Sequence, residues 1–477
     1  MTVNRLIKGL NNSTQTENGA EAFKSSLNAN LDYFATVAAA RNRDTISLFK
    51  AAYSEDRQLA LRNLFHLRDV RGGKGERDSF RKHLAWLYGN DRSAFYAMVP
   101  HVPFYGRWDD ITSYVADPVV VEFVRAQFQN DARSKTPSLL AKWMPSENAS
   151  SKATKTLARA WAQALELELP IYRRNLSQLR KTLRIVERSM SAQEWNEIEY
   201  KRVPSNAMKQ YRKAFGKHDA EGFAAYLKAV EKGETKINAG TLFPYEIFMG
   251  LWNKQPDSVL EAQWKALPQY LGDKKFLVCP DVSGSMYSGQ VPNIPPIAMS
   301  VSLAIYVSQF ATGAFKDQII SFDSNPMFYD LSGIKTVYEK IRKVMSCSGL
   351  STDLEKLFLT LLATAKRYKV PQSDMPDYLL VISDMQFNSC FGNPRQTLYD
   401  RFRELFAQAG YVAPTLVYWN VNSKENQVGM LDTAQNAIMV SGASAHVLKS
   451  ALAGNSTTPV DAMLETLNAD RYQNITV

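Results

Sequence analysis

The chain has 477 residues, of which 45% are hydrophobic and 22% charged, a composition typical of folded globular proteins. Because this length exceeds what one hydrophobic core usually covers, we expect two domains. No run of about 18 apolar residues occurs, and the N-terminus lacks the hydrophobic segment of a signal peptide, so we expect a soluble, cytoplasmic protein that does not bind a membrane. The three cysteines have no metal-ligand spacing, which fits a reducing compartment.

The net charge of +10 is unevenly distributed along the chain. Residues 1–270 contain 40 Lys and Arg against 29 Asp and Glu, whereas residues 271–477 contain 17 against 18. Residues 170–217 alone contain 12 basic and 4 acidic side chains. Such a concentration of positive charge on an otherwise balanced protein indicates a polyanionic partner.

The N-terminal half is expected to be helical. Residues 1–30 are rich in Asn, Ser, Thr and Gln, and we expect them to form a mobile arm; the alternative is that they return to pack on the second domain. From residue 31 to 270, apolar residues recur at three- and four-residue spacing, which predicts many helices and few strands, as in an α-solenoid built from helix pairs. The expected helices cover 32–40, 45–53, 55–67, 77–88, 118–130, 151–168, 171–190 and 219–230.

From residue 271 the pattern changes to alternating strands and helices, which indicates a parallel sheet covered on both faces. The expected strands cover 276–280, 317–323, 378–383, 414–420 and 437–441. The expected helices cover 296–311, 334–345, 353–368, 394–409, 444–453 and 458–468.

A glycine-rich segment, Arg71-Gly-Gly-Lys74-Gly-Glu-Arg77, precedes one expected helix. Glycine amides and a lysine ahead of a helix are suited to holding a phosphate group. The segment lacks the Gly-Lys-Ser/Thr sequence of a nucleotide-binding P-loop, so we do not expect ATP hydrolysis. Two interpretations remain: Arg71 and Lys74 contact an anion, or the segment is a plain turn before a helix.

Two basic clusters follow in the same half of the chain. A single helix over 171–190 would place four arginines on one face and leucines on another. The second cluster has Tyr200 and Tyr211 interleaved with cations, a combination that suits the phosphates and bases of single-stranded nucleic acid. The candidate RNA contacts are Arg173, Arg174, Arg180, Lys181, Arg184, Arg188, Lys201, Arg202, Lys209, Arg212, Lys213 and Lys217, together with Arg71 and Lys74. The alternative is a solvated face that keeps the protein soluble.

Three short segments with oxygen-bearing side chains lie where expected strands end or a helix begins. They are Asp281-Val-Ser283-Gly-Ser285, Ser351-Thr352-Asp353 and Ser383-Asp384. Hydroxyls and carboxylates are the ligands that a hard cation such as Mg²⁺ prefers, and the carboxyl ends of parallel strands meet at one edge of a sheet. The alternative is that the serines cap the next helix and Asp384 merely ends a strand.

Because these three segments occur together, residues 274–477 resemble a von Willebrand factor A domain with a metal-ion-dependent adhesion site. The resemblance implies that five residues ligate the metal directly or through water, leaving one position for an acidic group of a partner. These residues are Asp281, Ser283, Ser285, Thr352 and Asp384.

A basic helical region followed by such a domain resembles the Ro autoantigen family, whose helical part is the TROVE module. Residues 236–246 and 438–442 add to the resemblance, while 71–77 and 105–109 look closer to a divergent Ro-like branch. The resemblance implies a ring-forming, HEAT-like helical-repeat domain over 31–270 and a doubly wound α/β A domain over 271–477.

We therefore expect a monomeric, non-catalytic ribonucleoprotein component that binds single-stranded ends of misfolded or small non-coding RNA. Mg²⁺ in the A domain would be structural or would recruit an exoribonuclease or another protein. The alternative is an adhesion-type, metal-dependent protein-interaction module on a helical scaffold. A metal-dependent hydrolase is a third interpretation; it would need a general base and a second metal or an activated water, and only Asp353 and Asp384 are expected to lie near enough to take part.

Overall fold

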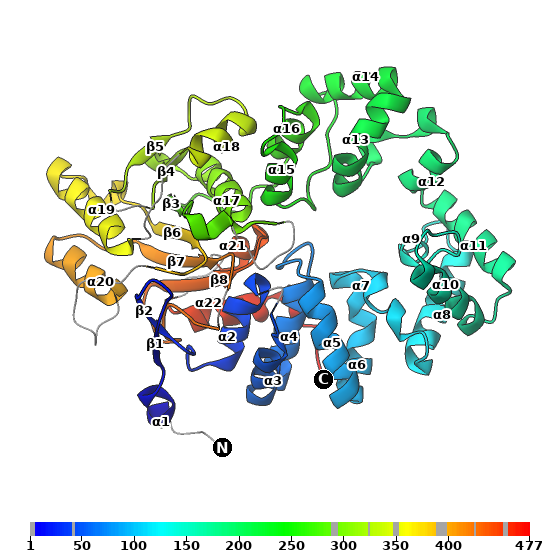
Figure 1. Cartoon of the computed structure of the whole chain (residues 1–477), viewed down its shortest axis with the longest axis horizontal. Coiled ribbons are helices and arrows are strands. Elements are labelled where there is room, and N and C mark those ends of the chain that lie inside the picture. Colours follow the sequence, from blue (N-terminus) through cyan, green and yellow to red (C-terminus); the bar gives the residue numbers. More distant parts are fainter. Residues whose placement is uncertain are drawn as a thin grey trace. The chain divides into compact units, whose positions relative to one another are not determined.

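The computed structural model describes residues 5–40, 43–287, 294–322, 325–346, 353–387, 398–423, 426–451 and 457–477. The chain forms two compact units (Figure 1). Unit 1 comprises Met1–Ser79 and Leu242–Asn474, and unit 2 comprises Phe80–Thr241 with Ile475–Val477. None of the described helices is long and apolar enough to cross a membrane.

A six-stranded sheet forms the centre of unit 1 (Figure 1). In chain order its strands are β3 (Phe276–Pro280), β4 (Gln318–Ile320), β5 (Phe328–Asp330), β6 (Tyr378–Ser383), β7 (Thr415–Asn420) and β8 (Ala437–Ser441). The spatial order is β5-β4-β3-β6-β7-β8, and every neighbouring pair is parallel except β4 and β5. Counted from β3, this is the 3-2-1-4-5-6 order of doubly wound folds, whose direction of winding reverses between β3 and β6.

The strands that the sequence predicts are confirmed, and the short edge strand β5 was missed. β3, β7 and β8 are buried along almost their whole length. Parallel strands covered on both faces appear in a sequence as short continuous apolar runs, which explains why they were recognisable. In register, Val278 lies beside Leu380, and Leu380 lies beside Val417.

Helices from both ends of the chain cover this sheet. The largely buried α17 (Pro296–Phe310) packs against β3, β4 and β6. The other helices that follow the first strand are α18 (Val337–Met345), α19 (Leu354–Tyr368), α20 (Leu398–Gln408), α21 (His446–Ala451) and α22 (Pro459–Leu467). The preceding helices of unit 1 are α1 (Arg5–Leu10), α2 (Ala29–Thr36), α3 (Ile46–Glu55), α4 (Arg57–Arg68), α15 (Pro244–Leu251) and α16 (Ser258–Lys265).

The compact units do not divide at the expected boundary between residues 270 and 271. Helix α2 packs against β8 and α22, and α4 also packs against α22, so the N-terminal helices share the core of the sheet. Helices α15 and α16 likewise belong to unit 1. Apolar periodicity identifies the buried face of a helix but not the element that covers it, and here that element lies at the other end of the chain.

Unit 2 is helical throughout its described residues. Its helices are α5 (Asp78–Asn90), α6 (Arg92–Met98), α7 (Val102–Tyr105), α8 (Pro118–Arg133), α9 (Leu140–Trp143), α10 (Lys152–Ala164), α11 (Leu169–Thr182), α12 (Val186–Ser191), α13 (Ser205–His218) and α14 (Ala220–Glu231). Sequential pairs pack together, for example α10 with α11 and α13 with α14. Helix α8 begins as the sequence indicates, because Asp117 accepts hydrogen bonds from the amides of Val119 and Val120.

Candidate nucleic-acid interface and metal site

The basic segment that we expected to be one helix forms two, α11 and α12. Between them, Arg184 adopts a left-handed conformation with a φ of +50°. Its amide donates to the Lys181 carbonyl at 2.9 Å, and the amide of Ile185 donates to the Arg180 carbonyl at 3.2 Å. This pair of bonds is a Schellman ending, which usually uses glycine. The predicted face of four arginines is therefore wrong, since Arg184 and Arg188 do not continue α11.

Arg180 uses its guanidinium group within the fold. Nε donates to the Ala141 carbonyl at 2.8 Å, one terminal nitrogen to the Met144 carbonyl at 2.9 Å, and the other to Ser146 Oγ at 2.7 Å. Burial lowers the pKa of Arg180. The side chain thus fixes the loop after α9, and the expectation that it binds phosphate does not fit this position.

Four other arginines of the predicted set form ion pairs with glutamates. The pairs are Arg173 with Glu147 (3.7 Å), Arg184 with Glu199, Arg188 with Glu194, and Arg202 with Glu199 (3.0 Å). Exposed ion pairs contribute only about 0–1 kcal/mol, so a phosphate group could displace a glutamate at small cost. Of the remaining cations, Arg212 and Lys209 are half-buried, and the Arg212 guanidinium donates to the Lys209 carbonyl.

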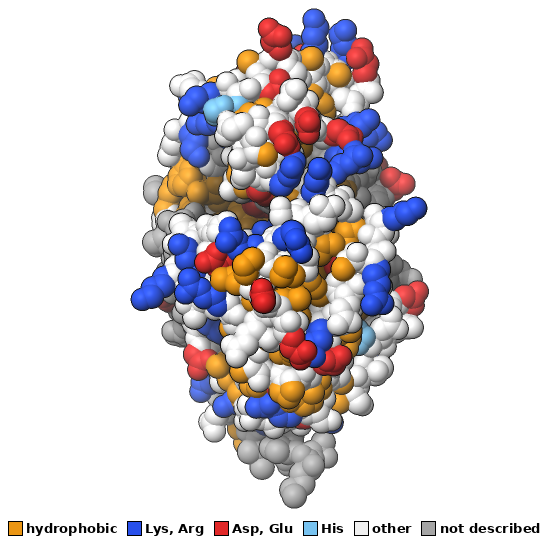
Figure 2. Space-filling model, turned by 90° about the vertical axis from the view of Figure 1, so that its right-hand side faces the viewer, with side chains coloured by type: hydrophobic (Ala, Val, Ile, Leu, Met, Phe, Trp, Pro, Cys, Tyr) orange, Lys and Arg blue, Asp and Glu red, His pale blue; other side chains and the backbone are white. Residues whose placement is uncertain are grey.

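Five cations of the two basic clusters are exposed and form no ion pair with the described residues. They are Arg174, Lys181, Lys201, Lys213 and Lys217. Arg174 and Lys181 are seven residues apart on α11 and share a face, as do Lys213 and Lys217 one turn apart on α13. On the face drawn in Figure 2, Lys and Arg side chains lie among Asp and Glu side chains rather than in one unbroken field.

Unit 2 contains nearly all of the net positive charge. Residues 80–241 include 26 Lys and Arg against 17 Asp and Glu, a net of +9 out of the +10 of the whole chain. The positive charge predicted for residues 1–270 is therefore concentrated in a shorter part of the chain, residues 80–241.

The glycine-rich loop after α4 folds around Asp69 instead of presenting its amides to solvent. The amides of Arg71 and Gly72 donate to Asp69 Oδ1 at 3.0 and 3.1 Å. Arg471 also donates to this carboxylate, and the Tyr472 hydroxyl does so at 2.9 Å. Burial alone would raise the pKa of Asp69, but the hydrogen bonds from Arg471 and the Arg71 amide keep it below its ordinary value. The loop is the plain turn of our second interpretation.

Lys74 is buried and does not contact an anion from solvent, so this predicted RNA contact is wrong. Its Nζ donates to the Phe34 carbonyl and to Ser441 Oγ, the latter at 3.1 Å, and lies 4.1 Å from the centroid of the Phe34 ring. Burial lowers the pKa of Lys74 to about 7. The side chain joins the glycine-rich loop to α2 and β8, whereas Arg71 is exposed.

The oxygen-bearing residues lie at the point where the winding of the sheet reverses. Asp281 follows β3 and Asp384 follows the parallel neighbour β6. Asp281 Oδ1 accepts from the Ser283 amide at 2.9 Å, and Oδ2 accepts from Ser383 Oγ at 2.6 Å. Ser283 Oγ lies 3.1 Å from Ser285 Oγ. In doubly wound folds, ligands bind at the carboxyl ends of the strands beside this reversal.

The environment of these carboxylates suits a cation. Asp281 is 0% and Asp384 1% exposed. Burial raises the pKa of Asp281, although hydrogen bonds from Ser283 and Ser383 oppose the effect. A cation would stabilise the ionised form that burial disfavours, and hard cations accept hydroxyl together with carboxylate oxygens. Among the described residues no three His, Cys, Asp or Glu side chains form a metal-binding group, so hydroxyls would have to complete any site.

The third expected segment is only partly described. Thr352 lies outside the described residues. The neighbouring Asp353 caps α19, since its Oδ1 accepts from the Lys356 amide at 2.9 Å. This capping role engages one of the two oxygens of the carboxylate that the hydrolase interpretation needed.

The N-terminal segment contacts the loop that carries Asp384. Strands β1 (Ser13–Gln15) and β2 (Glu21–Phe23) form a hairpin. At its tip, Thr16 Oγ1 donates to the Phe387 carbonyl, the Glu17 amide to Gln386 Oε1 and Asn18 Nδ2 to the Gln386 carbonyl, each at 2.7 Å. The hairpin therefore holds the residues that directly follow Asp384.

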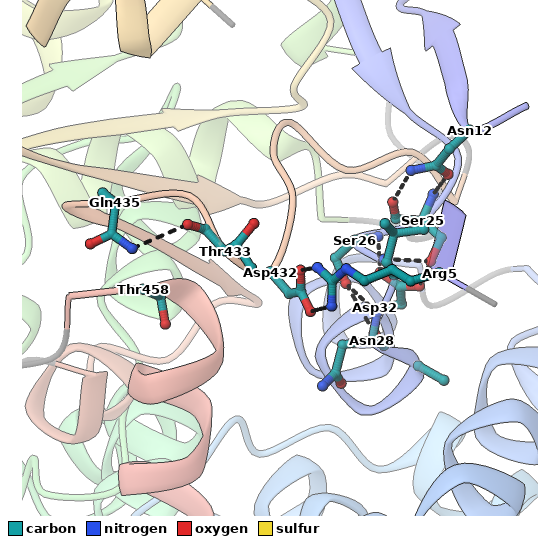
Figure 3. A network of polar contacts seen from close by, with 12 residues as sticks. Arg5, Asn12, Ser25, Ser26, Asn28, Asp32, Asp432, Thr433, Gln435 and Thr458 are labelled. Atoms are coloured by element: carbon teal, nitrogen blue, oxygen red, sulfur yellow. Dashed lines mark hydrogen bonds and ion pairs between the residues drawn. The ribbon is translucent and has the colours of Figure 1, made fainter. Parts of the chain in front are cut away.

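Further contacts anchor the rest of this segment to unit 1 (Figure 3). Arg5 on α1 pairs with Asp432, and the amide of Asp432 donates to the Ser26 carbonyl at 3.0 Å. Asp32 on α2 in turn accepts from the Ser26 amide at 2.7 Å. The expectation of a mobile arm over residues 1–30 is wrong for residues 5–30, whose polar composition reflects this hydrogen bonding.

The aromatic residues expected to contact bases are engaged inside the fold. Tyr200 is buried and donates to Asp219 at 2.7 Å, and the Tyr211 hydroxyl lies 3.4 Å from Glu187. A different aromatic pair, Trp195 and His218, was not predicted; its rings are stacked with centroids 4.4 Å apart. The two residues lie on separate elements, so no sequence spacing predicts their contact.

Comparisons with known proteins match most of the chain to uncharacterised sequences. The profile of the family described as domain of unknown function DUF2828 matches residues 16–97 and 111–277, more than half of the chain. A second profile, domain of unknown function DUF7788, matches residues 276–474. The uncharacterized protein L728 of Acanthamoeba polyphaga mimivirus is 28% identical over 502 residues, which cover 95% of this chain and 86% of that protein.

Among solved structures, the crystal structure of the Ro (RSR) protein of Deinococcus radiodurans aligns with a TM-score of 0.40 and 14% sequence identity. The alignment covers 89% of this chain and 90% of that chain. Because the DUF2828 profile matches more than half of the chain, this chain belongs to the DUF2828 family, whose function is unknown.

Proposed function

We propose that this chain is a non-catalytic RNA-binding protein that holds RNA on the exposed cations of unit 2. The observation that carries the proposal is the location of the charge: residues 80–241 have a net charge of +9. Within that unit, five exposed cations of the two predicted basic clusters form no ion pair with described residues, namely Arg174, Lys181, Lys201, Lys213 and Lys217. Unpaired exposed cations gain most from phosphate groups, because binding releases the counterions that surround a nucleic acid.

The RNA class follows from the resemblance described above rather than from the charge. In the Ro-like interpretation, unit 2 is a HEAT-like helical repeat that forms part of a ring, and the RNA is a small non-coding RNA or the single-stranded end of a misfolded one. Two features support a helical repeat: sequential helix pairs pack together, and several helices end in left-handed Schellman turns, at Glu166, Arg184, Gln193 and Gly233.

For unit 1 we propose a von Willebrand A-type domain that binds Mg²⁺ at the reversal point of the sheet. Asp281, Ser283, Ser285 and Asp384 would hold the ion, with Thr352 as a further ligand. The support is the pair of buried carboxylates beside hydroxyl groups and the strand order. When bound, the ion would neutralise these carboxylates and provide a position for an acidic group.

A second candidate function, an adhesion-type protein-interaction module, is favoured by the exposure of this same edge. Gly284 is exposed and Ser285 is half-buried, so a partner can approach the hydroxyls. The partner implied by the resemblance is an exoribonuclease or another protein with an exposed acidic side chain. If this were the main function, Asp281→Ala would abolish partner binding and leave RNA affinity unchanged.

Fluorescence anisotropy with a labelled 20-nucleotide oligouridylate tests the RNA proposal. If the five cations each neutralise one phosphate, log Kd should change with log salt with a slope of about 3.5, a roughly 100-fold loss of affinity from 50 to 200 mM KCl. Lys213→Glu with Lys217→Glu should weaken binding and reduce that slope. The matched control is Lys366→Glu with Arg367→Glu, two exposed cations on α19 of unit 1. A flat salt profile, or equal effects of the two double variants, would contradict the proposal.

A further inference from the structure

One stacked aromatic pair of unit 2, Trp195 and His218, reaches the protein surface. Trp195 begins a short 3₁₀ turn (Trp195–Glu197) after α12, and His218 is the last residue of α13. Their rings are stacked and nearly parallel, with an interplanar angle of 9° and centroids 4.4 Å apart. Trp195 is half-buried and its indole N–H donates to Gln193 Oε1 at 3.2 Å, whereas His218 is exposed. The half-buried indole therefore stacks under an imidazole ring that reaches solvent.

Neighbouring aromatic residues are part of a separate, packed cluster. Tyr200 packs against Phe215, Phe223 and Tyr226, at ring-centroid distances of 5.3, 5.0 and 5.6 Å. Phe215 and Phe223 are buried. These rings stabilise the α13–α14 pair, whereas the Trp195–His218 stack lies apart from them and includes an exposed imidazole ring.

Exposed cations lead along α13 to this surface. Lys217 precedes His218, and Lys213 lies one helical turn before Lys217, about 6 Å along the axis. Both lysines are exposed. Glu194, beside Trp195, is paired with Arg188, which leaves Glu197 as the exposed acidic group of the turn. Cations in a row beside a supported ring match a single strand, whose phosphates are anionic and whose unpaired bases stack.

We infer that His218, supported by Trp195, is a stacking platform for an unpaired nucleobase, with Lys213 and Lys217 contacting the flanking phosphates. This inference rests on the proposed RNA-binding function and adds a site to it. A duplex cannot use the platform, because its bases are already stacked within the helix. The platform would therefore favour single-stranded RNA without reading its sequence.

The test measures the affinity of full-length His218→Ala and His218→Phe for a labelled 12-nucleotide oligouridylate and for a 12-base-pair RNA duplex. Because loss of one stacked base typically weakens binding about 5- to 100-fold, His218→Ala should lose affinity in this range for the single strand only. His218→Phe should restore it, since phenylalanine keeps the flat ring and carries no charge. A matched control is Tyr368→Ala, which removes a 68% exposed ring beside Arg367 on α19.

Trp195 fluorescence provides a second measurement that does not depend on affinity. Stacking of a base on the His218–Trp195 pair should quench part of the wild-type emission on RNA binding, and Trp195→Phe should lack that part. If the wild type binds the oligouridylate while His218→Ala binds it equally well, the platform is refuted and the proposed function stands. If the wild type binds neither RNA, both are refuted.

Discussion

Replacing Lys74 by methionine should change how the stability of unit 1 depends on pH. The ammonium group of Lys74 is fully buried, and its hydrogen-bond acceptors are the Phe34 carbonyl and Ser441 Oγ. Ser441 Oγ also donates to the Phe34 carbonyl at 3.0 Å, so both groups keep a partner when the lysine is removed. Methionine has a similar length and no charge, and we expect Lys74→Met to fold.

The sign of the pH dependence follows from the number of protons that the folded and the unfolded states bind. Burial lowers the pKa of Lys74 to about 7, from 10.5 in the unfolded chain. Between these values, unfolding takes up a proton, so the free energy of unfolding of the wild type rises as the pH is raised. Below pH 7 Lys74 is protonated in both the folded and the unfolded state, so it no longer makes the free energy of unfolding depend on pH. At 1.36 kcal/mol per pKa unit, the burial of this charge costs at most about 5 kcal/mol, of which about half is regained between pH 8 and 10.

Lys74→Met lacks this linkage and should be more stable than the wild type at pH 6, by an amount that shrinks towards pH 10. Urea unfolding followed by circular dichroism at pH 6, 8 and 10 measures the difference, and groups common to both proteins cancel. Lys366→Met, which removes an exposed lysine of the same unit, is the control and should give a pH-independent difference. If the wild type and Lys74→Met have parallel pH profiles, the lysine is not buried as a charge and the reasoning is wrong.

Other features of unit 1 give further tests. Mg²⁺ should raise the melting temperature of the wild type but not of Asp281→Asn, and an equal rise in both would place the ion elsewhere. Gly442→Ala should lower stability by about 1–3 kcal/mol in thermal unfolding, because φ is +106° and the new Cβ would lie 2.9 Å from Ala38 Cβ. Gly333→Ala is the control and should leave stability unchanged, because its new Cβ would meet no atom within 4 Å. Thr16→Val removes the hydrogen bond to the loop after β6 and should speed amide hydrogen exchange there several-fold, while unchanged exchange would mean that the hairpin does not hold this loop.

The sheet was predictable from the sequence because burial on both faces leaves an unambiguous pattern. β3, β6 and β8 have the bounds expected from their apolar runs. The polar residues after β3 and β6 could then be placed at one edge by the rule for parallel strands, and Asp281 and Ser383 do meet there, at 2.6 Å. Local pattern and general topology suffice for such a site.

The basic surface was less predictable, because the sequence alone does not show which group an arginine or lysine contacts in the folded chain. Arg180 holds carbonyl groups of another loop, and Lys74 is buried under α2, although both resembled exposed phosphate contacts. Arg184 adopts the conformation that usually requires glycine, so nothing in the sequence indicated the break between α11 and α12. These outcomes depend on tertiary contacts, which periodicity and charge counts do not contain.

The packing of α2 against β8 also constrains how the protein is made. Ribosomes add about 5–20 residues per second, so α2 waits roughly 20–80 s after its synthesis before β8 emerges. Residues 80–241 are contiguous, and they can fold during that interval. Helices α3 and α4 can cover part of α2 soon after it is made, but the part of α2 that packs against β8 and α22 has no native cover until translation is nearly complete. We expect molecular chaperones to bind this N-terminal helix on the nascent chain.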